Sequence, residues 1–162
     1  MGLETTAIRG VTTHYGKRET SKQYGGEFSV EGPIRTIDYV FDYNELPTYG
    51  SNNQQVVIPA YAKVISSYFE ILEAFTSTST TTDLDVGLYT SAGVAIDADG
   101  LHTAAQLTQT AIATRGLFYI GAGALVGVSI GATAGEVVVA PNAADLLTGK
   151  ARLIIKYITE GV

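Results

Sequence analysis

Alternating apolar and polar residues are the dominant pattern of this chain, and they predict short β-strands. Between residues 34 and 43 an apolar side chain recurs at every second position from Ile37 to Tyr43, as in a strand with one buried face. The expected extended runs are 34–43, 56–58, 63–72, 84–89, 94–96, 117–120, 125–130, 137–139 and 152–158. Because Gly, Pro, Asn and Asp separate these runs, an antiparallel sandwich or barrel is indicated.

Helix signals are few. Residues 102–112 are compatible with a short helix or an extended loop, and Asn142 precedes an Ala-Ala-Asp-Leu-Leu stretch in the manner of a helix N-cap. Neither segment is long enough to form a layer of helices. The predicted fold class is therefore all-β, an antiparallel β-sandwich of jelly-roll type with an extended N-terminal arm.

One uncharged stretch allows a competing interpretation. Residues 116–135 carry no charge, and glycines recur at four-residue spacing from Gly123 to Gly135, as in a transmembrane helix with a glycine packing face. We favour a hairpin of buried strands, because Val126, Val128 and Ile130 alternate with small residues and because each glycine would weaken a helix by about 1 kcal/mol. We therefore expect no membrane association.

The chain divides into an arm and a body. Residues 1–26 lack sustained periodicity, and residues 1–30 are interpreted as an extended arm that orders against a partner, although composition allows a disordered tail equally. Residues 31–162 form the expected sandwich body, with a linker-like break at 44–55. The Ser/Thr run 76–82 is expected to be a solvated loop tip, with a subunit or glycan contact as the alternative.

Charge narrows the possible partners. The 162 residues include 10 Lys and Arg against 16 Asp and Glu, a net charge of −6, which argues against nucleic-acid binding. The positive charge is concentrated in residues 1–26, where four bases stand against two acids, so a mildly basic arm is joined to an acidic body. Without cysteine, disulfides and thiolate metal sites are excluded.

The candidates for chemistry are weak. His14 and His102 are too far apart in sequence to form a helical metal pair, and a solvent-facing His102 is preferred over a mixed site with Asp97 and Asp99. Asp99-Gly100 is expected to form a hairpin turn, since the flanking positions lack the ligands of a calcium loop. No nucleophile or dinucleotide motif is present, so we expect a protein that is not an enzyme and that has no cofactor or metal.

The pair Asp83 and Asp85 shares one face of a predicted strand. Such carboxylates could bind Ca²⁺ or act in glycoside hydrolysis. A solvated strand entry is the preferred interpretation, because nothing in the sequence indicates a perturbed carboxylate there.

Tyrosine usage points to contacts with a partner. Three of the ten tyrosines, Tyr15, Tyr24 and Tyr49, lie in non-periodic sequence, where a large side chain with a polar tip suits a partly wet interface. Together with the bases of the arm they form the candidate partner-binding set. That set is Arg9, Tyr15, Lys17, Arg18, Tyr24 and Tyr49.

Several segments resemble small structural proteins of tailed-bacteriophage virions. They are residues 57–65 (Val-Ile-Pro-Ala-Tyr-Ala-Lys-Val-Ile), 73–76 (Glu-Ala-Phe-Thr), 84–87 (Leu-Asp-Val-Gly) and 149–158 (Gly-Lys-Ala-Arg-Leu-Ile-Ile-Lys-Tyr-Ile). The likeness is greatest to head decoration, or cement, proteins; it covers roughly residues 55–158, and Tyr61 stands where that family usually has glycine.

This resemblance implies a role for the chain. It implies a non-enzymatic virion protein on the exterior of the phage head, with the major capsid protein as partner and a homo-oligomer, most often a trimer, as the assembly state. The alternatives are another virion component, such as a neck, tail or fibre protein, and a carbohydrate-binding sandwich. The lack of Trp argues against the carbohydrate-binding module.

Overall fold

The computed structural model describes residues 12–14, 27–29, 34–46 and 56–159. The chain divides into two compact units, Met1–Arg35 and Thr36–Val162. In the first unit, β1 (Thr12–His14) pairs antiparallel with β2 (Glu27–Ser29), and Thr13 lies opposite Phe28. The rest of the predicted arm, and residues 47–55 of the predicted break, lie outside the described residues.

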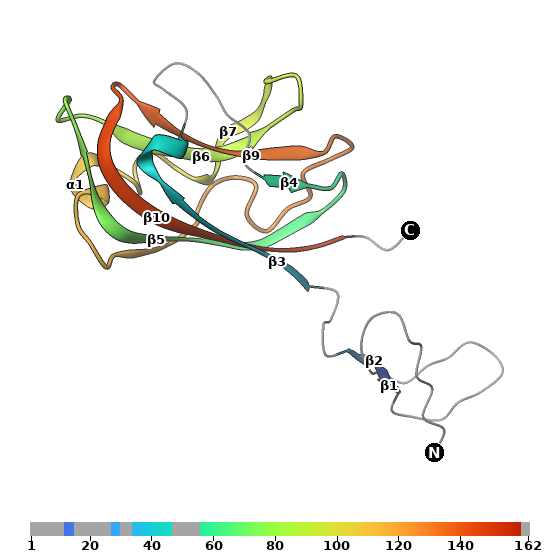
Figure 1. The fold of residues 1–162 in the computed structure, drawn as a ribbon. Helices are drawn as coiled ribbons and strands as arrows, with labels where there is room; N and C mark the ends of the chain where they lie inside the picture. The colour runs from blue at the N-terminus through green and yellow to red at the C-terminus, as the bar shows by residue number, and fades with distance from the viewer. Residues whose placement is uncertain (1–11, 15–26, 30–33, 47–55, 160–162) are drawn as a thin grey trace. The chain divides into compact units, whose positions relative to one another are not determined.

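The second unit is built from two four-stranded antiparallel sheets, which form two layers (Figure 1). One sheet, called the β5 sheet here, has the order β3-β10-β5-β8, and the other, the β6 sheet, has the order β4-β9-β6-β7. The strands are β3 (Ile34–Asp42), β4 (Val56–Ile58), β5 (Lys63–Ser77), β6 (Asp83–Tyr89), β7 (Ala95–His102), β8 (Phe118–Ile120), β9 (Gly135–Asn142) and β10 (Leu146–Ile158). Two short helices, η1 (Tyr43–Glu45) and α1 (Gln109–Ile112), complete the described elements.

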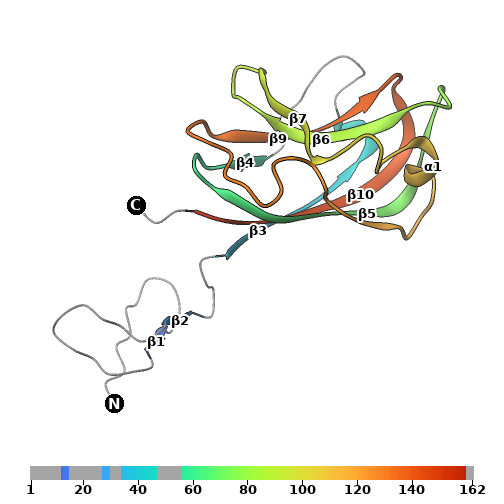
Figure 2. The ribbon, with the colours of Figure 1, turned by 180° about the vertical axis from the view of Figure 1, so that it is seen from behind.

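The order of the strands is that of a jelly roll. Successive strands from β3 to β10 alternate between the two sheets, except that β6 and β7 are neighbours in one sheet. Figure 2 shows the same two layers from behind, with β5 and β10 running side by side. The predicted all-β sandwich is confirmed, and the prediction of its jelly-roll type agrees with the strand order.

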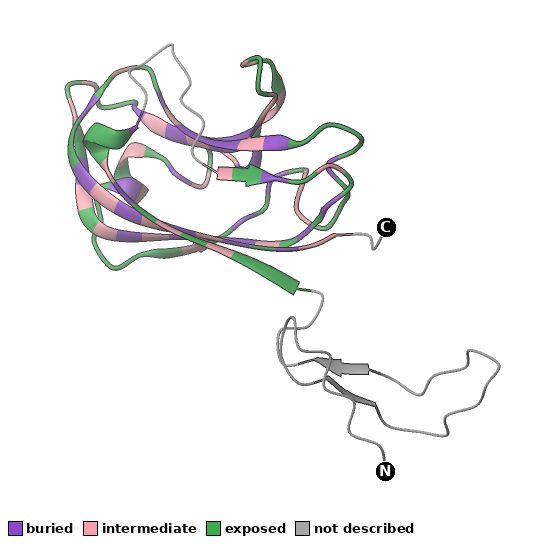
Figure 3. Ribbon diagram, turned by 45° about the vertical axis from the view of Figure 1, so that its right-hand side comes forward, coloured by how far each residue is buried: buried purple, intermediate pink, exposed green. Residues whose placement is uncertain are grey.

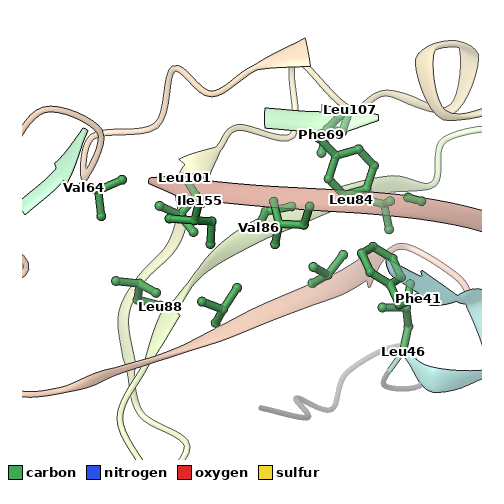
Figure 4. Close-up of a cluster of buried hydrophobic side chains, with 14 of the residues drawn as sticks. Phe41, Leu46, Val64, Phe69, Leu84, Val86, Leu88, Leu101, Leu107 and Ile155 are labelled. Atoms are coloured by element: carbon green, nitrogen blue, oxygen red, sulfur yellow. The ribbon is translucent and has the colours of Figure 1, made fainter. Parts of the chain in front are cut away.

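The core lies between the two sheets and explains the alternation in the sequence. Every second side chain of β6, from Leu84 to Leu88, is fully buried, and β5 and β10 supply Phe69 and Ile155 from the other layer (Figure 4). Figure 3 shows the resulting alternation of buried and partly exposed residues along the strands. Each such side chain contributes about 1.5–3 kcal/mol by its burial.

The predicted strand 125–130 is wrong. Residues 123–128 form turns and bends, and the segment bridges the two sheets instead of pairing in a hairpin. The backbone amide of Leu125 donates to Gly100 of β7, whereas that of Ile130 donates to Ala62, next to β5. Positive φ values of 90° at Gly127 and 85° at Gly131 allow the chain to turn between these partners.

Two further local predictions need correction, and a third, which left a short helix or an extended loop open, is resolved as a short helix. The stretch after Asn142 is a turn, with φ of 77° at Ala143, because β10 begins at Leu146 and directs that side chain into the core. Within residues 102–112, only Gln109–Ile112 is helical. Asp99-Gly100 lies inside β7; the hairpin turn falls earlier, where Thr90 and Val94 are joined by a backbone hydrogen bond.

The competing interpretation of the uncharged residues 116–135 is a transmembrane helix. Among the described residues, no helix has the length and apolar character needed to cross a membrane.

Candidate functional site

The partner-binding residues predicted from the sequence cannot be placed. Arg9, Tyr15, Lys17, Arg18, Tyr24 and Tyr49 all lie outside the described residues. A surface for partners is therefore sought on the second unit, where the two sheets each present one outer face.

The outer face of the β5 sheet carries a group of apolar and aromatic side chains among charged ones. Since Phe69 of β5 is buried in the core, its neighbour Tyr68 points outward. Tyr68 lies directly opposite Ile154 of β10 on one side and Ile120 of β8 on the other, so the three side chains form a row. We call this row, together with Phe118, the aromatic face.

Side chains of the aromatic face pack on one another and remain open to solvent. The rings of Tyr68 and Phe118 are stacked with centroids 5.4 Å apart. Nζ of Lys156 lies 5.8 Å from the centroid of the Tyr68 ring, a cation–π contact. Phe118 is nevertheless 52% exposed and Ile120 64% exposed. Both belong to β8, a strand of three residues.

An ion pair stands beside the aromatic face. Arg152 of β10 binds Asp38 of β3 in a bidentate manner, with nitrogen–oxygen distances of 2.7 and 2.6 Å. The hydrogen bond from Arg152 lowers the pKa of Asp38, and the same bond raises the pKa of Arg152. From Thr36 onward, the strands of this sheet carry four bases and four acids, so their charges balance. They are Lys63, Lys150, Arg152 and Lys156 against Asp38, Asp42, Glu70 and Glu73.

The β6 sheet differs sharply in charge. Its strands carry five acids and no Lys or Arg, a set called the acidic cluster here. It consists of Asp83, Asp85, Asp97, Asp99 and Glu136.

Burial and interactions with neighbouring acids perturb two members of the acidic cluster, Asp85 and Asp97. Partial burial, followed by the negative charges of Asp83 and Asp99, raises the pKa of Asp85. Partial burial and a hydrogen bond with Asp99 raise the pKa of Asp97. The expectation of an unperturbed, solvated strand entry is therefore wrong for Asp85. Among the described residues, no group of three or more His, Cys, Asp and Glu has an arrangement suited to a metal ion.

His102 is buried, contrary to the expectation that it faces solvent. Its ring lies between the sheets, where Nε2 is 2.9 Å from Oγ of Ser67, and both residues are 0% exposed. Burial lowers the pKa of His102 to about 4, so the imidazole is neutral at pH 7. A Ser–His pair enclosed in this way joins β5 to β7 and has no surface for a substrate.

Tyr61 adopts an unusual backbone conformation. Its φ is 59°, in the left-handed region that a bulky residue seldom occupies, and its side chain is 56% exposed. The conformation is held by a 2.7 Å hydrogen bond from its amide to the carbonyl oxygen of Gly131. The sequence singled out this position as one where glycine is usual, but no sequence signal indicated the exposed ring.

The eight strands and their order define a jelly roll, and known structures share this fold. No protein-family model matches the chain, and neither does any curated protein. Among solved structures, a chain of the cyanophage Pam1 capsid asymmetric unit is 19% identical, covers 90% of this chain and 98% of that one, and has a TM-score of 0.57.

Two further capsid structures contain similar chains. For the capsid of Ralstonia phage GP4 the identity is 16%, the coverage 81% of this chain and 87% of that one, and the TM-score 0.56. For the acidic stable capsid structure of Helicobacter pylori bacteriophage KHP30 the corresponding values are 16%, 79%, 89% and 0.51. At these identities the likeness shows a shared fold.

Proposed function

We propose that the chain is a non-enzymatic structural protein of a phage virion, which binds the lattice of the major capsid protein and decorates the exterior of the head. The observation that carries the proposal is the fold likeness to chains of three phage capsid structures. The match covers 87% to 98% of those chains, so it extends over nearly their whole length and not over one motif. The segments that resemble decoration proteins, residues 57–65, 73–76, 84–87 and 149–158, belong to the same jelly roll.

The physical properties of the chain suit such a role. A protein that occupies many equivalent positions on a lattice needs only moderate affinity at each contact, because the contacts act together. Charged residues make up only 16% of the chain, which limits repulsion between neighbouring copies. A jelly roll also leaves few open strand edges that would favour uncontrolled aggregation.

The proposal also includes a role for the N-terminal arm. Residues 1–30 reach neighbouring subunits of the lattice, and the candidate set from Arg9 to Tyr49 supplies charged and aromatic contacts. Ordering of the arm on docking costs conformational entropy, which the wrapped surface offsets. A trimer is the proposed assembly state, on the strength of the resemblance.

The experiment uses capsids of the chain's own virus, purified without this chain. The full-length protein is added in increasing amounts, and the bound fraction is measured by co-sedimentation. Saturation at a fixed number of copies per capsid is expected. Binding to purified tails and not to capsids would contradict the proposal and would favour a neck, tail or fibre component.

A second variant tests the arm separately. Deletion of residues 1–26 should reduce occupancy on the capsid at equal protein concentration, with the truncated protein still folded by circular dichroism. Unchanged occupancy would remove the arm from the proposal while leaving capsid binding itself intact.

A further inference from the structure

The aromatic face has the composition of a buried interface although it is exposed. Phe118 and Ile120 stand on a three-residue strand at the edge of the β5 sheet, and neither belongs to the core. The backbone pairing of Phe118 with Glu70 and of Ile120 with Tyr68 does not require apolar side chains at these positions. Aromatic residues are enriched at protein interfaces, because they supply a large contact area at a low cost in side-chain entropy.

The charges around the aromatic face indicate the chemistry of its partner. Arg152 is already paired with Asp38 at 2.6 Å, and Glu70, which lies opposite Arg152 and Phe118, also interacts with Arg152 electrostatically. Lys156, by contrast, makes its cation–π contact with Tyr68 and has no ion-pair partner within the described part of the chain. Its charge would lie at the rim of any interface that covers Tyr68, where a carboxylate would match it.

Two further exposed apolar side chains lie near the start of β5: Tyr61 precedes the strand, and Ile65 belongs to it. The neighbouring Ala62 and Val64 are buried, whereas Tyr61 is 56% and Ile65 42% exposed. The left-handed backbone conformation of a bulky residue such as Tyr61 lowers the stability of the folded protein, yet the chain has Tyr here with its ring exposed to solvent. Strain of this kind at an exposed aromatic ring is expected where the ring serves a contact.

We propose that the aromatic face, with Tyr61 and Ile65, is the surface by which the second unit docks, and that its occupant is a capsid-lattice surface of apolar side chains bordered by carboxylates. The inference rests on the proposed function and names the contact surface that it leaves open. The charge difference between the sheets supports this orientation, because the five acids of the β6 sheet would be repelled by a partner with carboxylates.

The main test compares two double variants in the full-length protein. The combination of Phe118→Thr and Ile120→Thr removes the apolar side chains but keeps residues that suit a strand. The matched control combines Val57→Thr and Val94→Thr, which replace two other solvent-exposed apolar residues, 55% and 63% exposed, on β4 and in the turn before β7. Affinity for capsids that lack this chain, thermal midpoint and oligomeric state are measured for each.

The face variant is expected to bind capsids at least about 10-fold more weakly, whereas the control stays within about twofold of the original protein. Equal affinities of the two variants, with the original protein still binding, would overturn the inference and leave the proposed function standing. No binding by the original protein would overturn both. If the face variant loses a homo-oligomer in solution but keeps its capsid affinity, the occupant is a second copy and the inference is wrong.

Two single-site tests do not depend on the stability of β8. Lys156→Glu should weaken capsid binding about 10-fold and reduce its sensitivity to salt. Its control is Thr78→Glu with Thr80→Glu, which changes the net charge by the same two units at an exposed loop tip. Equal effects of both would mean that only the overall charge matters, which contradicts the inference.

Tyr61→Asn separates strain from binding. Asn accepts the left-handed conformation more readily than Tyr does, so the thermal midpoint should stay the same or rise. Capsid affinity should nevertheless fall several-fold because the ring is lost. A variant with higher thermal stability and unchanged affinity would remove Tyr61 from the docking surface.

Discussion

The two sheets of the jelly roll share one core but present very different outer surfaces. The β5 sheet shows stacked aromatic rings and balanced charges, with Arg152 paired to Asp38. On the β6 sheet five acids occur without a Lys or Arg, and partial burial together with the charges of Asp83 and Asp99 raises the pKa of Asp85. Both sheets bury one face against the same core, so the difference between them is found on their outer faces.

This contrast also distinguishes the residues that packing in the core determines from those that it does not. The inward positions of β6 are set by packing; Val86, for instance, is fully buried. Outward positions such as Ile120 have no comparable demand from the core. An apolar residue exposed there lowers the solubility of the free protein, and a partner that covers the residue removes this effect.

The largest expected effect is at Gly87, where the backbone of β7 crosses the β6 strand closely. A Cβ at this position would collide with the carbonyl oxygen of Asp97 and the backbone of Ala98. Gly87→Ala should therefore lower the free energy of unfolding by about 3 kcal/mol or more, measured by urea denaturation. In Gly127→Ala, where a Cβ meets nothing, only the left-handed backbone opposes the change, and about 1 kcal/mol is expected. Similar losses in both variants would contradict the close crossing.

The next effect concerns the hydrogen bond that joins the two sheets. His102 has a pKa of about 4 in the folded protein against 6.5 for an unperturbed histidine, so in this range the unfolded chain binds a proton that the folded chain does not. Stability should fall as the pH decreases from about 6.5 to 4, by about 3 kcal/mol in total from this residue. Urea unfolding at several pH values measures this loss.

His102→Gln provides the control for this pH dependence. Asp85 and Asp97 have raised pKa values in the folded protein, so their effect is opposite to that of His102. Their protonation increases the free energy of unfolding as the pH falls. Subtracting the curve of the variant from that of the original protein removes their contribution. Parallel curves for the two proteins would mean that His102 does not titrate differently on unfolding.

The sequence predicted the layers of this fold better than its connections. The run from Ile37 to Phe41 and the run from Leu84 to Leu88 alternate because one face of each sheet is buried, and this period is visible in a single sequence. Residues 125–130 show a similar alternation, but their backbone bonds go to Gly100 of β7 and to Ala62, which directly precedes β5 of the other sheet. A local pattern cannot distinguish such a bridge from a strand.

The functional surface was harder to predict for a related reason. Phe118 and Ile120 have the pattern of any strand, and only the register with Tyr68 shows that they face outward together. His102 looked solvent-facing because polar residues surround it in sequence, whereas its partner Ser67 is contributed by the opposite sheet. Non-local pairing decides both cases, and it becomes evident only in the folded chain.

A smaller effect is expected within the acidic cluster. Asp99→Asn removes the charge that helps to raise the pKa of both Asp85 and Asp97. The variant should be more stable than the original protein by about 0.5 kcal/mol at pH 7, and the gain should disappear near pH 3, where carboxylates are protonated. A loss of stability at pH 7 would indicate that the hydrogen bonds of Asp99 with Asp97 outweigh the repulsion between the acids.

The smallest effect is expected at the exposed ion pair beside the aromatic face. Asp38→Asn breaks the bidentate contact with Arg152 and should lower the thermal midpoint slightly at low ionic strength. The difference should vanish in about 1 M salt, because screening weakens exposed ion pairs. A large, salt-independent decrease would show that the pair has a structural role beyond its charges.

The most direct measurement is a cryo-electron microscopy reconstruction of capsids saturated with the full-length chain. We predict density for the jelly roll on the outer surface of the shell, with β8 and Tyr68 against the major capsid protein and Asp85 turned toward solvent. Capsids without added density, or density in which the acidic cluster contacts the shell and the aromatic face is exposed, would contradict the account.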